Sequence, residues 1–136
     1  MKKLSILFAA FAVVLLASCG KYEDGPGFSL RSKTSRIDGT WAVEKYSEDG
    51  VDYTDSYADV TYEFTDAGSF TISGSYFGIP FSETGTWELT SNDEDLTMVF
   101  SDGSIGVFKI LRLTNSEFWL SETSSGVTEL FHLKAK

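Results

Sequence analysis

The chain has 136 residues, with 11 basic and 20 acidic side chains and a formal net charge of −9 at pH 7. This acidity argues against nucleic acid and against an anionic lipid surface as partners. The single cysteine excludes disulfides within the chain, and a chain of this length buries enough surface to fold without them. Phe, Tyr and Trp make up 15% of the residues, which predicts an aromatic core or binding surface.

The first 18 residues have the layout of a secretory signal peptide. Two lysines precede an almost purely apolar run from Leu4 to Leu16, which is too short to cross a ~30 Å hydrocarbon layer comfortably. The motif Leu16-Ala17-Ser18-Cys19 resembles the lipobox of bacterial lipoproteins. The resemblance implies that residues 1–18 are removed and that Cys19 carries acyl chains such as palmitate, which hold it in a membrane. The alternative is an ordinary signal peptide with a chance cysteine near the cleavage site.

Residues 19–38 are predicted to form a flexible tether behind the lipidated cysteine. They are polar, contain Gly-Pro-Gly and show no sustained periodicity. Within this segment, residues 29–37 could add an edge strand or a short plug to the domain that follows.

The lipobox also implies a location in the cell envelope, anchored to the outer membrane. The domain would then lie on the periplasmic face or at the cell surface. Gly20-Lys21-Tyr22-Glu23-Asp24 only loosely resembles the acidic signals that some related bacteria use for surface export, so the side of the membrane stays open.

From residue 39 to residue 136 the sequence alternates between apolar and polar residues in short runs separated by turns. Short connections favour antiparallel neighbours, and closing the sheet removes its exposed edges. We therefore predict an all-β domain, an eight-stranded antiparallel up-and-down (meander) barrel, with a two-sheet sandwich as the alternative. The strands are expected at residues 41–46, 60–65, 70–76, 81–90, 96–100, 105–114, 118–120 and 127–133.

Several motifs in this domain resemble a known family. Gly39-Thr40-Trp41 looks like the Gly-x-Trp motif of lipocalins and fatty-acid-binding proteins, in which the tryptophan lies across the closed end of the barrel. The wider pattern is similar to the small lipocalin-like lipoproteins of Gram-negative bacteria, and its other signs are Tyr62-Glu63-Phe64, Gly85-Thr86-Trp87, Leu111-Arg112-Leu113-Thr114 and Phe118-Trp119-Leu120. The resemblance implies structural roles for Gly39 and Trp41 at the barrel end. Lipocalins usually set a basic residue from a late strand against that tryptophan, and here only Arg112 or Lys134 could do so.

The sequence offers little for catalysis or metal binding. His132 is the only histidine, and Asp93-Glu94-Asp95 reads as a solvated turn rather than a calcium loop. Serines occur on strand faces and in turns without a glycine-elbow motif, which disfavours a catalytic triad. Most acids occupy turns or the outward phase of strands, which disfavours a paired-carboxylate hydrolase. We expect no enzyme, no cofactor and no metal.

The remaining candidate is a ligand cavity, because an eight-stranded barrel is just wide enough to hold its own side chains or one small ligand. Glu83 is the most informative residue, since the alternation points it inward, where a carboxylate is costly unless it is paired, wet or neutral. The alternatives without a functional role for Glu83 are a strand bulge at Gly85 or a position at the open mouth of the barrel, where Glu83 is simply solvated. The candidate ligand-binding residues are Tyr62, Phe64, Phe70, Ile72, Glu83, Trp87, Met98 and Phe100. The same inward phase includes Trp41, Val43, Val60, Tyr76, Phe81, Leu89 and Leu96.

Two functions of different classes follow. Fatty-acid-binding relatives hold a carboxylate with interior basic residues, whereas the basic residues here are expected to face outward or lie near a terminus. The first hypothesis is therefore a lipid-anchored envelope lipoprotein that binds a small apolar ligand, neutral or weakly cationic. The second is a non-enzymatic interaction module with a filled core, docking another envelope protein. An interior void near Glu83 and Trp87 would support the first, and a fully packed barrel would exclude it.

Overall fold

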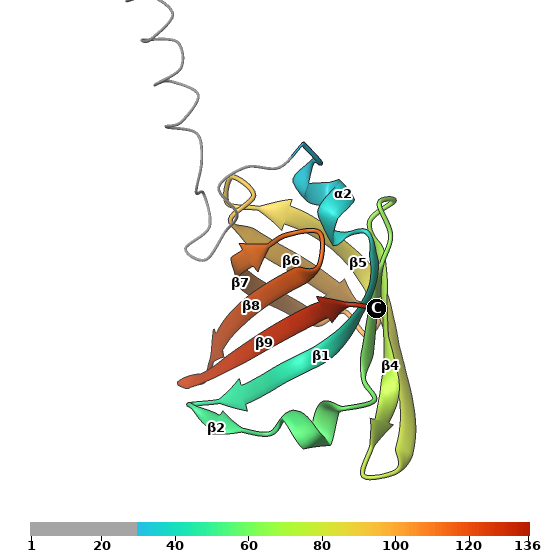
Figure 1. Cartoon of the computed structure of the whole chain (residues 1–136), viewed down its shortest axis with the longest axis vertical. Helices are drawn as coiled ribbons and strands as arrows, with labels where there is room; N and C mark the ends of the chain where they lie inside the picture. Colours follow the sequence, from blue (N-terminus) through green and yellow to red (C-terminus); the bar gives the residue numbers. More distant parts are fainter. Residues whose placement is uncertain (1–29) are drawn as a thin grey trace, which may run out of the picture.

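The computed structural model describes residues 30–136, which form one barrel with a short helix at one end (Figure 1). Helix α2 (Lys33–Ile37) comes first, and a single turn of 3₁₀ helix, η1 (Thr54–Tyr57), precedes the third strand. The strands in this range are β1 (Gly39–Glu48), β2 (Val51–Asp52), β3 (Thr61–Phe64), β4 (Ser69–Tyr76), β5 (Ile79–Thr90), β6 (Asp95–Phe100), β7 (Ile105–Leu113), β8 (Glu117–Ser124) and β9 (Val127–Ala135). None of the helices in residues 30–136 is long and apolar enough to cross a membrane.

The barrel closes through its first and last strands. Each strand from β3 to β8 pairs antiparallel with the strand that follows it, and β1 pairs with β3 on one side and with β9 on the other. The eight strands β1 and β3–β9 thus leave no open sheet edge between them, which confirms the predicted up-and-down barrel and excludes the sandwich.

Strand β2 is an addition that the alternation did not predict. It is a two-residue extension that pairs with the end of β1 through Ser47–Asp52 and Glu48–Val51. Asp49 and Gly50 make the connection at φ 47° and 83°, the left-handed values of a tight hairpin turn. Two residues are too few to show a period of two, so the signal for β2 lay only in its turn.

Helix α2 covers the end of the barrel at which β1 begins (Figure 1). The Ser32 hydroxyl caps it by accepting a hydrogen bond from the Ser35 N–H at 3.1 Å, and Ile37 is completely buried. Of the two forms considered for residues 29–37, the described part is a plug. The last residues of the predicted tether therefore belong to the folded domain, whereas Cys19 and residues 20–29 lie outside the described residues.

The closed end differs from the expected lipocalin arrangement in its basic residue. Arg112 forms an ion pair with Glu117 at 2.7 Å and lies 5.2 Å from the centre of the Trp119 ring, whereas the Trp41 ring packs against Phe118. Lys134 is exposed. The buried arginine at this end is Arg36 of α2, whose Nη1 donates a hydrogen bond to the Leu113 carbonyl at 2.8 Å. A five-residue helix carries too little periodicity for the sequence to have revealed this residue.

The predicted inward phase matches the core closely. Most of those residues are buried or half-buried in one aromatic cluster; the exceptions are Tyr76, which is 48% exposed, and Glu83, which is also exposed. Gly85 causes no bulge, since the pairing runs without a break from Phe70 across Gly85 to Phe100. A Cβ atom at Gly85 would lie 2.1 Å from the Val99 carbonyl oxygen and 2.8 Å from the Phe70 ring. Glycine is required there because the Phe70 ring packs directly against the strand.

Candidate functional site

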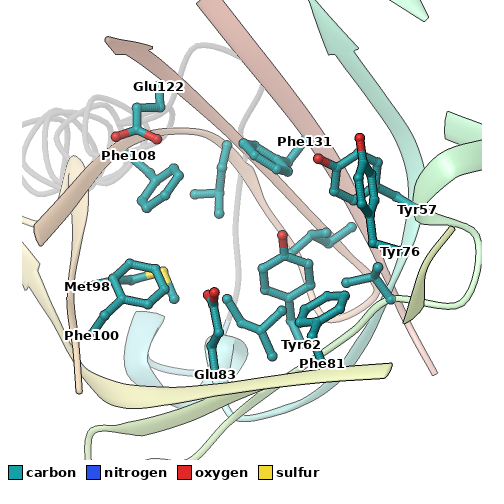
Figure 2. A pocket seen from close by; sticks show the side chains of 14 residues that line it. Tyr57, Tyr62, Tyr76, Phe81, Glu83, Met98, Phe100, Phe108, Glu122 and Phe131 are labelled. Atoms are coloured by element: carbon teal, nitrogen blue, oxygen red, sulfur yellow. The ribbon is translucent and has the colours of Figure 1, made fainter. Parts of the chain in front are cut away.

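The half of the barrel away from α2 contains a cavity of about 350 Å³ (Figure 2). Side chains from η1, from Val60 just before β3 and from β3 to β9 line it. The apolar part of the lining comprises Tyr57, Val60, Tyr62, Ile72, Tyr76, Phe81, Met98, Phe100, Phe108, Leu120, Phe131 and Leu133. Large aromatic rings therefore make up most of the wall.

Two glutamates complete the lining and come from different walls. Figure 2 shows Glu83 of β5 and Glu122 of β8 on separate sides of the cavity. Glu83 is solvent-exposed, so it matches the solvated alternative for an inward carboxylate. Glu122 is half-buried, and burial together with the nearby charge of Glu129 raises the pKa of its carboxyl above the usual range. One acid is therefore wet and the other partly desolvated.

A buried tyrosine lies beside a second pair of acids near the same end. The Tyr46 hydroxyl is 2.6 Å from Glu48 Oε1 and 2.5 Å from Glu129 Oε1. A hydroxyl has one proton, so Tyr46 can donate to only one of these carboxylates at a time. Burial and the two carboxylates raise the pKa of Tyr46, which keeps the phenol protonated.

Aromatic contacts connect this tyrosine to the cavity wall. The Tyr46 ring centre lies 4.2 Å from that of Tyr57 and 4.9 Å from that of Phe131, and both of these residues line the cavity. Tyr57 in turn lies 6.2 Å from Tyr76. The tyrosines and Phe131 thus form a continuous aromatic rim along one side of the cavity.

Five of the eight predicted ligand-binding residues line the cavity: Tyr62, Ile72, Glu83, Met98 and Phe100. The other three, Phe64, Phe70 and Trp87, do not line it and pack towards the closed end. Phe64 and Trp87 meet edge to face at 5.9 Å, and the Trp87 indole N–H donates to the Thr65 carbonyl at 3.0 Å. Alternation separates inward from outward side chains but carries no information on height along the barrel axis, which is why it grouped these three residues with those of the cavity.

Several wall residues were not predicted from the sequence, above all Tyr57, Phe108, Glu122 and Phe131. Residues 105–114 are apolar on both faces, so the phase of Phe108 was undecided. Glu122 shares the phase of Phe118 and Leu120, but the predicted strand ended at residue 120. Extending that alternation by one step would have identified Glu122 as inward. Tyr57 lies in η1, where no strand periodicity exists.

The described part of the chain shows no alternative chemical centre. Within residues 30–136, no group of three or more His, Cys, Asp or Glu side chains is placed to hold a metal ion. His132, the single histidine, stacks on Trp119 with ring centres 4.0 Å apart. The cavity is therefore the feature around which a function can be argued.

Comparison with known proteins identifies the family. The lipocalin-like domain matches residues 37–120, and the chain belongs to this family. A search of curated proteins finds no significant match.

Two solved structures share the fold. A redesigned β-barrel is 14% identical with a TM-score of 0.53, covering 80% of this chain and 99% of the other. A de novo designed fluorescence-activating β-barrel is 17% identical with a TM-score of 0.53, covering 79% of this chain and 100% of the other. These similarities support the eight-stranded barrel and carry no information on a ligand.

Proposed function

We propose that the protein is a non-catalytic cell-envelope lipoprotein whose barrel binds a small apolar molecule. The cavity carries this proposal. Its volume of about 350 Å³ far exceeds that of a few water molecules, each of which takes about 30 Å³ in the liquid. It also falls within the range of roughly 300–1,000 Å³ that is usual for ligand pockets with aromatic and aliphatic walls. A barrel that served only as a scaffold would gain stability by filling this space.

Binding of a neutral apolar dye tests the proposal directly. N-phenyl-1-naphthylamine, which fluoresces in apolar surroundings, should bind the purified chain, and Ile72→Trp should abolish the signal by filling the cavity. Val107→Trp is the matched control, because Val107 is an exposed residue on β7 that does not line the cavity. Equal dye binding by both variants, or no binding by the unmodified chain, would contradict the proposal.

The lipid anchor is the second part of the proposal and rests on the lipobox resemblance at Cys19. We expect the mature protein to begin at Cys19 with acyl chains attached and to fractionate with the outer membrane. Cys19→Ser should leave an unacylated protein that no longer fractionates with the membrane. Intact-mass measurement of the membrane-extracted protein checks both points, and an unmodified N-terminus at another residue would overturn the anchor.

Docking of another envelope protein remains the second candidate function. The tip of the β4–β5 hairpin favours it, because Phe77 is 83% exposed and Ile79 is 71% exposed. The filled core that this hypothesis assumed does not agree with the cavity. Phe77→Ser/Ile79→Ser should abolish cross-linking to an envelope partner in intact cells if the hairpin docks one, and unchanged cross-links would reject it.

A further inference from the structure

A row of three glutamates crosses neighbouring strands near the cavity. Glu48 of β1 pairs with Glu129 of β9, and Glu129 pairs with Glu122 of β8. Directly opposite residues in antiparallel strands project to the same face, and Glu122 lines the cavity. The row therefore faces the interior side of the barrel, although like charges in this position destabilise a sheet. With Glu83 on another wall, four carboxyl groups lie in or beside the cavity.

No positive charge in the cavity wall balances these acids. Among the described residues that line the cavity, none is a lysine, arginine or histidine. The Tyr46 hydroxyl provides one hydrogen-bond donor to the row, shared between Glu48 and Glu129. Carboxylates in a partly desolvated apolar cavity interact more strongly with a cation than the same groups would in water. The cavity therefore favours positive charge and disfavours a carboxylate ligand.

The aromatic wall suits a cation as well as an apolar group. Phe81, Phe100, Phe108 and Phe131 present rings to the cavity, and an ammonium group over such a ring face is attracted to it. The Tyr62 hydroxyl points into the cavity (Figure 2). Its oxygen has no hydrogen-bond partner within residues 30–136, and burial raises the pKa of the phenol. The hydroxyl is not among the fully buried polar atoms that lack a partner, so a ligand or water in the cavity can reach it and complete its hydrogen bonding.

We propose that the ligand of this cavity is a hydrophobic cation, such as a protonated alkyl or aryl amine. Its ammonium group would lie inside the cavity, between the walls that carry Glu83 and Glu122, within reach of an aromatic ring. Its apolar part would extend between Tyr62, Met98 and Phe100. This inference rests on the proposed function, because it specifies the ligand class of the same cavity.

Three probes with one alkyl chain and different head groups test the charge requirement. Octylammonium, octanol and octanoate are titrated calorimetrically into the mature chain, residues 19–136, produced without residues 1–18. We expect octylammonium to bind at least about tenfold more tightly than octanol, the effect of one modest charge-assisted hydrogen bond. Octanoate should bind most weakly.

Charge-neutral variants locate the interaction. Glu83→Gln/Glu122→Gln should lower the affinity for octylammonium by at least about tenfold and leave the affinity for octanol unchanged. Glu63→Gln/Glu88→Gln is the matched control, since it removes the same charge from exposed positions on β3 and β5 that do not line the cavity. The control should bind all three probes like the unmodified chain.

The outcomes separate this inference from the proposed function. If octanol binds as tightly as octylammonium, or if the control pair weakens amine binding as much as the cavity pair, the cation preference is overturned while the apolar site stands. If none of the three probes binds, both the inference and the proposed site fail. The probe comparison on the unmodified chain decides the charge preference even if a variant folds poorly.

Discussion

Both ends of the barrel are rich in aromatic residues, but these residues pack tightly at the closed end and line a cavity at the other end. At the closed end, Trp41 donates its indole N–H to the Ile37 carbonyl at 2.9 Å and packs against Phe118 at 5.6 Å between ring centres. At the other end, aromatic rings surround a cavity and share it with carboxylates. Cavities and like charges both lower stability. The closed end is therefore the better packed of the two, while the open half keeps locally unfavourable features of the kind that functional sites retain.

Removal of a phenylalanine ring should lower the free energy of unfolding more at the closed end than in the open half, and this is the largest difference that we expect. Phe118→Ala removes a completely buried ring at the closed end and should lower the free energy of unfolding by about 3–5 kcal/mol. Phe108→Ala removes a half-buried ring from a wall that already borders a cavity, so the loss should be about half as large. Urea denaturation of both variants measures the difference. Equal losses would mean that the open half is packed as tightly as the closed end.

The helix plug provides the next test of the closed end. Ile37→Ala should cost about 2–5 kcal/mol, because the side chain is completely buried although it precedes the first barrel strand. Thr34→Ala, at an exposed position of the same helix, is the control and should change stability little. Urea denaturation checks both variants. A negligible effect of Ile37→Ala would show that the domain starts at Gly39, as the sequence alone suggested.

A smaller effect is expected from the acid row of the open half. Because the pKa of Glu122 is raised in the folded protein, ionisation of this carboxyl lowers stability as the pH rises through that pKa. Glu122→Gln should therefore raise Tm slightly at pH 7. The difference should disappear in acid, where the carboxyl is protonated in the unmodified chain too. Thermal unfolding followed by circular dichroism, from acid to pH 7, measures the difference in Tm. A lower Tm for the variant at pH 7 would contradict the raised pKa of Glu122.

Much of the barrel was predictable because its strands obey a simple period. Each predicted strand has a counterpart, and the inward phase of Glu83 placed this residue in the cavity wall. The position of a residue along the barrel axis was not predictable, since it depends on how the strands are staggered. For this reason Trp87 was expected near the cavity, which it does not line. Arg36 and Tyr57 lie in helices of four or five residues, which are too short to have a pattern. The facing of Glu48 and Glu129 depends on the pairing of β1 with β9, a closure contact that no local pattern encodes.

We propose above all that the open half of the barrel holds a small apolar molecule. Native mass spectrometry of the protein purified from its own host tests this most directly. We expect a species heavier than the lipidated chain by the mass of one small molecule, which Ile72→Trp eliminates and Val107→Trp retains. A spectrum that contains only the unliganded chain, together with no binding of the neutral dye, would contradict it.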